Sequence, residues 1–459
     1  MNKYKKRLVF KNCAAYLIII VCVLAMFLRI INVVFLTDAQ ITLIILLMAS
    51  ALLITEVIPL ALGAMTVPIA TVLTGILPVK SAFSGFANEN VILFGAMFII
   101  GGAMFRTGVA KIIGETVVKC AGGNQRLLIL YVMIVTATLS SVMSNTGTVV
   151  VLLPVCVGIA DSAGMNRKYI LLPLAAMASL GGMITLVGTP PNMTVSALLQ
   201  EYGYEGFRFL EFAWIGIPMS AVGCIYMYLI YRKKLAGESK AQGTALQTER
   251  KQTEKVEVYF DKRQKLSIAI LIAVVIVMAT GALNLTLGAV IGAMACVLLG
   301  LVNQDEAIED IDWTTMFLFS GMLPLADALE LTGAGQIIAE QALRIIGNNT
   351  SSLMILTVLF VITAVLTQFM SNTATCALLA PIGMEIAIAL GASPKSVLIV
   401  IAVASSSSFA TPMAMPPNTL VMGPARAKFM DFVKMGVPLI VISYMVCIVL
   451  VPVFWPFFP

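Results

Sequence analysis

The sequence contains no histidine, and only 11% of its 459 residues are charged. The eight cysteines are scattered, nearly all within apolar stretches, and no two of them form a Cys-x-x-Cys pair. Without histidine or such a pair, a zinc site and a His-based catalytic relay are excluded. A soluble domain carries about 25% charged residues, whereas 60% of this chain is apolar. The composition therefore predicts a membrane protein in which the cysteines serve packing.

Apolar runs long enough to cross a hydrocarbon core of about 30 Å as helices recur along the chain. We expect an all-α polytopic membrane protein with eleven crossings, at 14–35, 40–57, 60–78, 90–108, 170–198, 209–231, 266–282, 285–302, 313–333, 395–421 and 432–456. Two further apolar regions, 127–159 and 352–389, are split by polar residues. These two regions are predicted to enter the membrane and return as re-entrant hairpins.

The Lys and Arg residues predict the orientation of the chain. Fifteen of the 29 lie before the first crossing or between Arg232 and Lys265. Basic residues near membrane ends stay on the cytoplasmic side. We therefore expect 1–35 to be a cytoplasmic segment with a retained first helix, 232–265 a cytoplasmic linker, and the C-terminus extracytoplasmic in the cell membrane. The net charge of +6 reflects this topology and needs no nucleic-acid partner.

A short polar phrase occurs twice, about half a chain apart. Ser144-Asn145-Thr146 is followed by Pro190-Pro191-Asn192, and Ser371-Asn372-Thr373 is followed by Pro416-Pro417-Asn418. The two asparagines of each pair are 47 and 46 residues apart. Such a duplication within apolar sequence predicts a transporter whose binding site lies between two repeats.

Two inverted repeats account for this pattern. The first, 36–231, contains the hairpin 127–159 and a broken helix at 170–198; the second, 266–459, contains the hairpin 352–389 and a broken helix at 395–421. Each repeat has five crossings, and an odd number inverts the second repeat relative to the first. The two Ser-Asn-Thr tips should therefore enter from opposite sides and meet near the midplane.

The motifs have the chemistry of an ion and anion site. Ser-Asn-Thr at a helix N-terminus offers free N–H groups, hydroxyls and an amide to an anion, with a favourable helix dipole. Asn and Ser oxygens, with carbonyls freed where proline breaks a helix, suit Na⁺. No Lys or Arg lies in either motif, so bound Na⁺ would supply positive charge for a dianion and couple the two binding events. One such motif alone is usually only an N-cap.

Other polar residues within apolar sequence are weaker candidates. Glu56, Arg106, Asp327, Glu330 and Glu385 lie in or near apolar runs, where ionisable groups are candidates for function. None has a counterpart in the other repeat, and snorkelling accounts equally for several of them. The run 405–408 is four serines, which serve either a hydrated path or close helix packing.

At these residues the chain resembles the divalent anion/sodium symporter family, whose members carry dicarboxylates, citrate or sulfate. The resemblance covers essentially the whole chain, and the paired Ser-Asn-Thr motifs are its specific part. It implies a homodimer in the lipid bilayer, in which a scaffold domain holds the partner and a transport domain moves like an elevator. It also implies sodium-coupled symport of a small divalent anion such as succinate, malate or citrate, with Na⁺ as the coupling ion and no organic cofactor.

The family's binding residues map onto the repeated motifs. The substrate contacts implied by the resemblance are Ser144, Asn145, Thr146, Ser371, Asn372 and Thr373, with Thr189, Pro190, Met415 and Pro416 at the helix breaks. The first implied Na⁺ site consists of Ser140, Ser144, Asn145 and Gly188, and the second of Thr367, Met370, Asn372 and Ala414. Dicarboxylate carriers of the family typically have Thr where this chain has Met415. A thioether is a poor hydrogen-bond partner, so the dicarboxylate preference is open while anion transport is not.

The residue types that are missing from the motifs bear on the alternative functions. A sodium-independent or proton-coupled exchanger, or a permease for sulfate or another inorganic anion, would use the same architecture. A Na⁺/H⁺ antiporter usually needs a carboxylate beside the broken helices, and neither motif supplies one. An intramembrane enzyme would want a His, a paired carboxylate or a Ser with a base, which argues against that class.

Overall fold

The computed structural model of the chain describes residues 19–27, 29, 36–109, 112, 124–162, 165–241, 261–346, 351–412 and 414–458. All regular secondary structure in these residues is helical, which confirms the all-α prediction. Six described helices are long and apolar enough to cross a membrane, namely Asp38–Thr55, Glu89–Arg106, Ala213–Arg232, Lys262–Thr280, Asn372–Ala389 and Phe429–Phe454. Of the predicted segment 1–35, residues 19–27 are helical and most of the rest lies outside the described residues.

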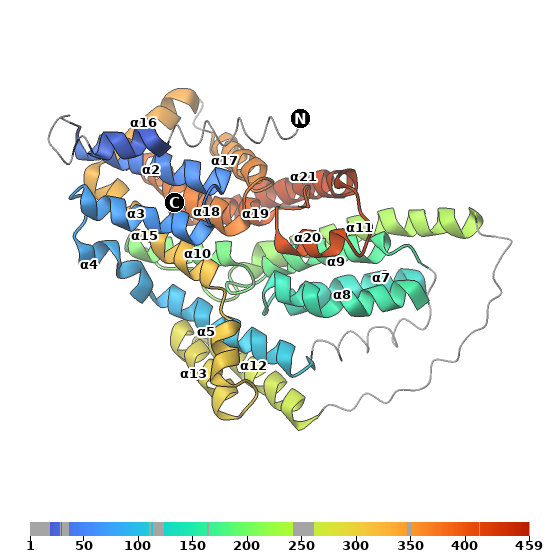
Figure 1. Cartoon of the computed structure of the whole chain (residues 1–459). Helices are drawn as coiled ribbons and strands as arrows, with labels where there is room; N and C mark the ends of the chain where they lie inside the picture. Colours follow the sequence, from blue (N-terminus) through green and yellow to red (C-terminus); the bar gives the residue numbers. More distant parts are fainter. Residues whose placement is uncertain are drawn as a thin grey trace, which may run out of the picture.

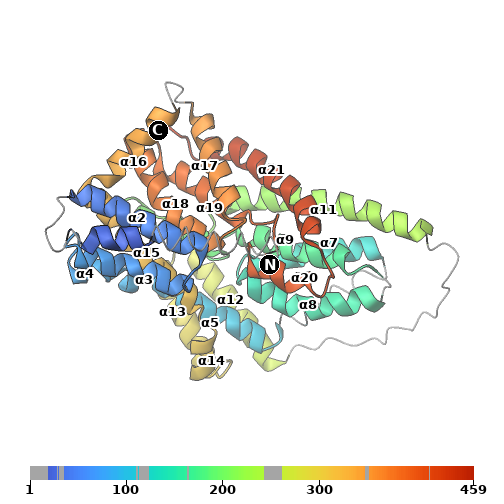
Figure 2. The same ribbon diagram turned by 45° about the horizontal axis from the view of Figure 1, so that its top comes forward.

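The described helices follow the same order in both halves of the chain. The first half contains α2 (Asp38–Thr55), α3 (Leu60–Leu73), α4 (Val79–Ala82), the 3-10 turn η1 (Ser84–Ala87), α5 (Glu89–Arg106), α7 (Gln125–Ser140), α8 (Asn145–Ser162), α9 (Lys168–Gly182), α10 (Pro190–Glu201) and α11 (Ala213–Ala241). The second half contains α12 (Lys262–Thr280), α13 (Leu285–Leu298), α14 (Gln304–Glu309), α15 (Trp313–Thr332), α16 (Ala334–Ile346), α17 (Ser352–Leu366), α18 (Asn372–Ala389), α19 (Pro394–Ser406), α20 (Pro416–Met422) and α21 (Phe429–Phe454). In both views α2, α3 and α4 lie at one end of the molecule, and α7, α8 and α11 lie at the other (Figures 1 and 2).

Equivalent helices of the two halves make equivalent contacts, each with helices of the other half. Helix α3 packs against α15, and its counterpart α13 packs against α5. In the same way α10 packs against α18 and α19, whereas α20 packs against α8 and α9. Where α9 and α19 meet, the Ser179 hydroxyl donates to the Ser406 carbonyl oxygen at 2.7 Å. The halves are therefore interlocked and do not stand side by side as separate domains.

The predicted linker 232–265 overlaps a helix at each of its ends. Helix α11 continues to Ala241, and α12 begins at Lys262. Asp261 caps α12, with its side chain accepting from the Lys262 backbone N–H and with Gln264 completing a capping box, a signal that marks a helix start. Charged residues can extend a helix beyond the apolar core, so apolar runs understate helix length. Residues 242–260 lie outside the described part of the chain.

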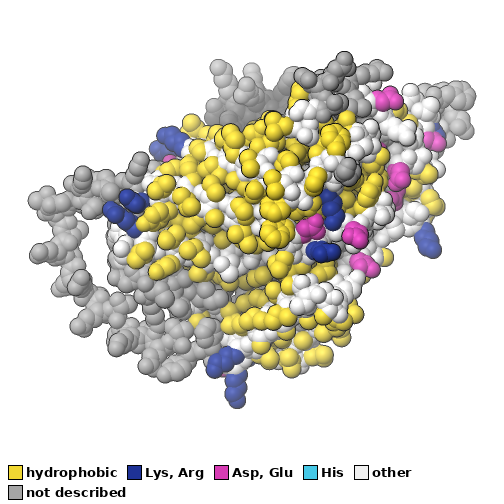
Figure 3. Space-filling model, turned by 180° about the vertical axis from the view of Figure 1, so that it is seen from behind, with side chains coloured by type: hydrophobic (Ala, Val, Ile, Leu, Met, Phe, Trp, Pro, Cys, Tyr) yellow, Lys and Arg dark blue, Asp and Glu magenta, His cyan; other side chains and the backbone are white. Residues whose placement is uncertain are grey.

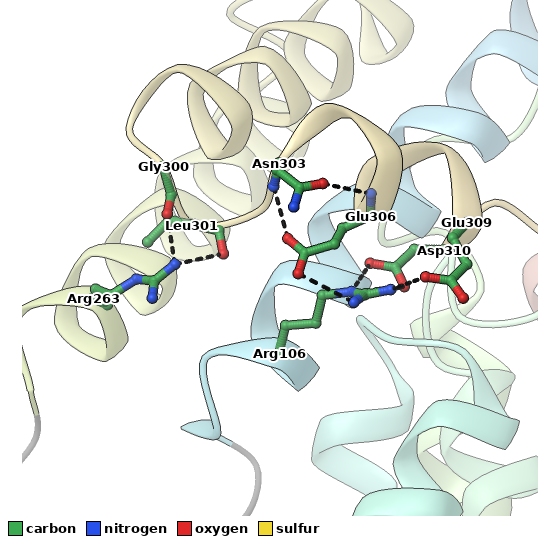
Figure 4. A network of polar contacts seen from close by, with 8 residues as sticks. All are labelled: Arg106, Arg263, Gly300, Leu301, Asn303, Glu306, Glu309 and Asp310. Atoms are coloured by element: carbon green, nitrogen blue, oxygen red, sulfur yellow. Dashed lines mark hydrogen bonds and ion pairs between the residues drawn. The ribbon is translucent and has the colours of Figure 1, made fainter.

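An ion-pair network ties the end of α5 to α14 (Figure 4). Arg106 Nη2 lies 2.9 Å from Glu309 Oε2, Arg106 Nε lies 2.9 Å from Asp310 Oδ2, and Arg106 Nη1 lies 3.4 Å from Glu306 Oε1. Gly102 admits this arrangement, because a Cβ there would lie 2.0 Å from Asp310 Oδ2. Arg106, one of the weaker sequence candidates, therefore joins helices and does not line the candidate site.

The molecular surface agrees with a membrane protein. A broad expanse of apolar side chains covers the face seen in Figure 3, and charged side chains gather in a few small groups. Large apolar side chains such as Leu298, Val453 and Leu331 are exposed in the chain alone. A soluble monomer rarely exposes contiguous apolar area of this extent, so lipid or protein must cover it.

Candidate functional site

The repeated motifs meet at one cavity of about 370 Å³. Twelve of the fifteen predicted site residues line it, namely Ser144, Asn145, Thr146, Gly188, Thr189, Pro190, Ser371, Asn372, Thr373, Ala414, Met415 and Pro416. The other three, Ser140, Thr367 and Met370, are buried behind the cavity wall. Residues separated by more than 200 positions in the chain thus line one cavity that is large enough for a small ligand.

Each hairpin consists of two helices joined by a short tip. Residues 141–144 connect α7 to α8, and residues 367–371 connect α17 to α18. Ser371 caps α18 by accepting a hydrogen bond from the Ala374 N–H at 3.2 Å, and Ser144 accepts from the Gly147 N–H at 3.1 Å. The first turns of two helices therefore face the cavity, where their free N–H groups and dipoles favour an anion.

Behind each tip, oxygen atoms converge in a repeated arrangement. The Ser140 hydroxyl lies 2.8 Å from Asn145 Oδ1 and 2.6 Å from the Ala178 carbonyl oxygen. In the second half, the Thr367 hydroxyl lies 3.2 Å from Asn372 Oδ1 and 2.5 Å from the Ser405 carbonyl oxygen. A hydroxyl has one proton to donate, so each cluster has more acceptors than donors. Such a set of oxygens has the chemistry of a site for a small hard cation.

Both broken helices are interrupted directly before the Pro-Pro pairs, as the sequence predicts. Residues 183–189, here called the first break, separate α9 from α10, and residues 407–415, the second break, separate α19 from α20. Pro190 and Pro416 stand at the first position of the helix that follows each break, where the missing N–H costs nothing. Non-helical backbone at membrane depth needs protein or water to satisfy it, and the two asparagines of the Pro-Pro-Asn motifs do so.

These asparagines fasten the breaks. Asn192 Nδ2 donates to the Thr185 carbonyl oxygen at 2.8 Å and lies 3.5 Å from that of Gly182. Asn418 Nδ2 donates to the carbonyl oxygens of Thr411 at 2.8 Å and Ser408 at 2.9 Å. The sequence pattern included both asparagines but did not predict this role for them.

A second pair of bonds joins each break to the tip of its own hairpin. The Thr185 hydroxyl donates to the Ser141 carbonyl oxygen. In the second half the Thr411 hydroxyl donates to the Gln368 carbonyl oxygen at 2.6 Å. Tip and break are therefore positioned together in each half, and no pattern in the sequence predicted these partners.

The first half is more tightly packed around its oxygen cluster than the second. A Cβ on Gly182 would lie 2.3 Å from Asn145 Oδ1 and 3.0 Å from the Gly188 carbonyl oxygen. A Cβ on Gly188 would lie 2.5 Å from the Gly182 carbonyl oxygen. Only glycine fits at these two positions. Ser408 and Ala414 stand at the matching positions of the second break, so the two clusters differ in space and in chemistry.

Thr189 and Met415 occupy matching places at the ends of the two breaks. The Thr189 hydroxyl is buried and has no hydrogen-bond partner, which makes it available to a ligand in the cavity. Met415 is buried too, and its sulfur accepts a weak hydrogen bond from the Ser408 hydroxyl at 3.1 Å. The cavity wall therefore carries a hydroxyl on one side and a thioether on the other.

Residues from outside the motifs complete the cavity. Phe94, Met97 and Phe98 of α5, Leu60 of α3, and Asp312, Thr314, Thr315 and Leu318 at the start of α15 line it. None of them was predicted as a site residue. Asp312 is the one charged residue among those that line the cavity, and no Lys or Arg lies among them.

The ionisable candidates of the sequence lie in other environments. Glu385 accepts a hydrogen bond from the Tyr202 hydroxyl at 2.7 Å, away from the cavity, and Asp327 and Glu330 are not among the cavity residues. Glu56 ends α2 and lines an open groove of about 590 Å³ that shares Ser371, Ala414, Met415 and Pro416 with the cavity. Of these candidates, only Glu56 lies beside the repeated motifs.

The chain is similar to several transporters. It is 26% identical to the uncharacterized transporter YfbS of Escherichia coli, over 86% of this chain and 95% of the relative. It is 24% identical to the sodium-dependent dicarboxylate transporter SdcS of Staphylococcus aureus, over 87% of this chain and 82% of the relative.

Two solved structures have a similar fold. The YdaH transporter of Alcanivorax borkumensis matches with a TM-score of 0.62 at 18% identity, over 85% of this chain and 90% of that one. MtrF of Neisseria gonorrhoeae, described as illuminating a class of antimetabolite efflux pumps, matches with a TM-score of 0.57 at 18% identity, over 85% of each chain. At this identity the likeness concerns the fold alone.

The sequence profile of a citrate transporter family matches residues 50–374 and, in a second overlapping match, residues 279–458. Together these matches span both hairpins, both breaks and the cavity between them. The prediction of a membrane transporter, and not an enzyme, is confirmed, and the chain belongs to the citrate transporter family.

Proposed function

We propose that this protein is a secondary active transporter that couples the movement of Na⁺ to the uptake of a divalent organic anion, such as a C4-dicarboxylate or citrate. The observation that carries the proposal is the meeting of two hairpin tips and two breaks at one cavity without any Lys or Arg in its wall. A dianion there needs positive charge from elsewhere, and bound Na⁺ provides it.

The proposed Na⁺ sites are the two oxygen clusters behind the tips. Ser140, Ser144, Asn145 and the Gly188 carbonyl oxygen form the first, and Thr367, Met370, Asn372 and the Ala414 carbonyl oxygen form the second. The 2.8 Å approach of Ser140 Oγ to Asn145 Oδ1 supports the first site, and the 3.2 Å approach of Thr367 Oγ1 to Asn372 Oδ1 supports the second. A cation at either place would draw its hairpin tip and its break together.

The proposed substrate lies between the two tips. One carboxylate would accept hydrogen bonds from the Ser144-Asn145-Thr146 turn and the Thr189 hydroxyl, and the other from the Ser371-Asn372-Thr373 turn. Each helix N-terminus contributes about half a positive charge. Because the ions assemble the tips that hold the anion, the affinities for Na⁺ and anion rise together, as coupling requires.

We further propose that 36–231 and 266–459 are inverted repeats and that the protein moves as an elevator. The hairpins, the broken helices, α11 and α21 would form the transport domain, and α2–α5 with α12–α15 would form the scaffold of a homodimer. The exchanged packing of α3 with α15 and of α5 with α13 supports a scaffold built from both halves. The basic residues that precede the first crossing and those between Arg232 and Lys265 support a cytoplasmic N-terminus and an extracytoplasmic C-terminus in the cell membrane.

Thermal unfolding of the purified protein tests the function directly. Succinate, malate, citrate and sulfate are each added in Na⁺ or in choline, with propionate as a monoanionic control. A ligand that binds only the native state stabilises it by about 2.7 kcal/mol at 100 times its dissociation constant. We expect one dianion or citrate to raise Tm in Na⁺ and to have no effect in choline.

Other results would redirect the proposal. Stabilisation by an anion that is equal in Na⁺ and choline would contradict sodium coupling and favour an exchanger. Stabilisation by sulfate but by no organic anion would contradict the substrate class. Uptake of the stabilising anion into proteoliposomes, driven by an inward Na⁺ gradient, then distinguishes transport from binding alone.

A further inference from the structure

Two carboxylates stand at the open side of the cavity. Asp312, at the start of α15, is exposed and lines the cavity. Glu56, at the end of α2, is exposed and lines the adjoining groove. The residues that line these two spaces include no Lys or Arg, so these carboxylates are the charges that an ion meets on its way to the tips.

The matching positions in the other half are neutral. Asp312 caps α15, and the cap of its counterpart α5 is Asn88. Glu56 ends α2, and the residue that ends the counterpart α12 is Gly281. In each comparison one half has a carboxylate where the equivalent position of the other half is neutral, and the nearest acidic residue to Asn88 is Glu89 in the first turn of α5.

The backbone at Glu56 suggests that its side chain has a function. Its φ is 51°, in the left-handed region, and Gly281 at the matching position has a φ of 67°. Glycine adopts this conformation without a steric penalty, whereas a side chain pays of order 1 kcal/mol or more. The second half has the residue that fits this turn best, and the first half has a carboxylate.

Charges near Asp312 do not neutralise it. Among the described residues, Asp312 forms no ion pair, and its carboxylate accepts from the Thr315 N–H at 3.1 Å and the Thr315 hydroxyl at 2.6 Å. The nearby guanidinium of Arg106 is shared by Glu306, Glu309 and Asp310. The segment 303–312 carries five acidic residues and no Lys or Arg, so the surroundings of Asp312 add to its negative charge.

The open side of the cavity faces the cytoplasm in the proposed orientation. The basic segment before α12 is cytoplasmic by the charge rule, so α12 crosses outward, α13 returns, and the start of α15 is on the cytoplasmic side. The opposite side is closed by contacts of α10, since Asn90 Nδ2 donates to Gln200 Oε1 at 2.7 Å and the Tyr202 hydroxyl, which donates to Glu385, lies 3.3 Å from the Ala326 carbonyl oxygen.

We propose that Glu56 and Asp312 form a negatively charged vestibule on the cytoplasmic side that lowers the affinity of the inward-open carrier for its anion and raises its affinity for Na⁺. The inference rests on the proposed function, and it adds a specificity element that the repeated motifs do not contain. The equivalent places in the other half are the neutral Asn88 and Gly281, and the carboxylate of Glu89, next to Asn88, accepts a hydrogen bond from the Asn284 amide at 3.2 Å. The vestibule therefore promotes release of the anion into the cytoplasm and hinders its return. The vestibule changes the rates at which ligands bind and leave on each side of the membrane. It does not change the anion gradient that the transporter can reach at equilibrium.

The expected size follows from Coulomb's law. For a carboxylate about 10 Å from a dianion, at an effective dielectric constant of about 40 to 80, the dissociation constant rises by a factor of about 4 to 17. The same charge favours Na⁺ by a factor of about 2 to 4. The two effects have opposite signs, whereas a steric or folding defect would weaken both ligands together.

The charge of the vestibule can be measured without any assumption about the cargo. A single cysteine replaces the exposed, cavity-lining Thr314 in a chain whose eight native cysteines have been removed. Its reaction rates with a cationic and an anionic methanethiosulfonate reagent are compared before and after Asp312→Asn. We take about 7 Å between the cysteine sulfur and the Asp312 carboxylate and a dielectric constant of about 80. The ratio of the cationic to the anionic reaction rate should then fall about sevenfold on Asp312→Asn. A cysteine at exposed Ala87, beside Asn88 in the other half, is the control and should show no change.

Sided transport measures the consequence. In inside-out vesicles, Asp312→Asn should lower the anion KM about 4- to 17-fold and raise the Na⁺ concentration for half-maximal rate, and Glu56→Gln should act in the same direction. Asparagine still caps a helix, so the substitution removes charge and little else. The reciprocal variant Asn88→Asp should instead raise the anion KM in right-side-out vesicles. About 1 M choline chloride, with a Debye length of about 3 Å, should abolish these differences.

The outcomes separate the two proposals. An unchanged reagent ratio at Thr314→Cys overturns the vestibule whatever the protein carries. A changed ratio in a protein that shows no Na⁺-dependent anion uptake overturns the proposed function and leaves the negative vestibule established. An Asp312→Asn effect of the same size on both faces, or of the same sign on anion and Na⁺, also overturns the inference.

Discussion

Replacing Gly182 by alanine should damage the first Na⁺ site and leave the second intact. The new Cβ would lie 2.3 Å from Asn145 Oδ1, whereas ordinary contact begins at 3.4 Å, so the two atoms must separate by about 1.1 Å. A movement of this size displaces Asn145 Oδ1 from its present place 2.8 Å from the Ser140 hydroxyl. Metal sites tolerate deviations of about 0.2 Å in their ligand distances.

The expected result is a rise of about 10- to 100-fold in the Na⁺ concentration for half-maximal transport, the size that a misplacement of about 1 Å produces at other preorganised sites. Thermal unfolding in choline reports the folding of the variant, and the midpoint of Na⁺-dependent stabilisation reports the site. The control is Gly101→Ala on α5, because no heavy atom lies within 4 Å of a Cβ built at Gly101. That variant should keep the Na⁺ dependence of the unsubstituted protein.

One result would refute the reasoning. If Gly182→Ala is folded and its half-maximal Na⁺ concentration lies within twofold of the unsubstituted protein, then Asn145 Oδ1 is not an Na⁺ ligand. The matching position in the second break provides a further test. Ser408 already stands at the matching place in the second break, so Ser408→Ala adds no atom there and should change the half-maximal Na⁺ concentration much less than Gly182→Ala does.

Three further predictions concern the cavity wall. Asn145→Ala and Asn372→Ala should each abolish Na⁺-driven uptake in proteoliposomes while the protein still inserts and unfolds cooperatively; normal uptake by either variant would contradict a site shared between the halves. Thr189→Val removes a buried hydroxyl that has no partner without ligand, so it should raise the substrate KM about 5- to 10-fold without lowering Tm in choline; a lower Tm with an unchanged KM would assign the hydroxyl to folding. Met415→Thr should lower the KM for C4-dicarboxylates about 3- to 10-fold by adding a donor; an unchanged KM would mean that the second break contributes only its backbone.

The position of the motifs at helix starts and at one cavity could be predicted from the sequence, because the signals are local and duplicated. The Ser-Asn-Thr phrases begin α8 and α18, and the Pro-Pro-Asn phrases begin α10 and α20, as the patterns predict. Proline and N-capping residues act within a few positions of themselves. Their effects can therefore be predicted without knowledge of the tertiary structure.

The part of the cavity wall that lies outside the motifs was not predicted, because it depends on tertiary packing. Asp312 is an ordinary helix cap in the sequence, and its place beside the cavity depends on how α15 packs between the halves. Glu56 was selected as an ionisable residue near an apolar run, but its left-handed backbone and the groove beside it depend on the fold. Arg106 was a weak functional candidate, and its three carboxylate partners lie about 200 residues away.

The bonds that fasten tip and break bear on how an internal duplication can be recognised. Ser140 corresponds to Thr367, and each places a hydroxyl beside the asparagine of its motif. Ser141 corresponds to Gln368, and each accepts a hydrogen bond from a threonine of the break through its backbone carbonyl. Equivalent stretches of two halves can thus differ in residue identity and keep the same donors and acceptors. A comparison that scores each position by the bond it makes would align these halves over a greater length than one that scores residue identity.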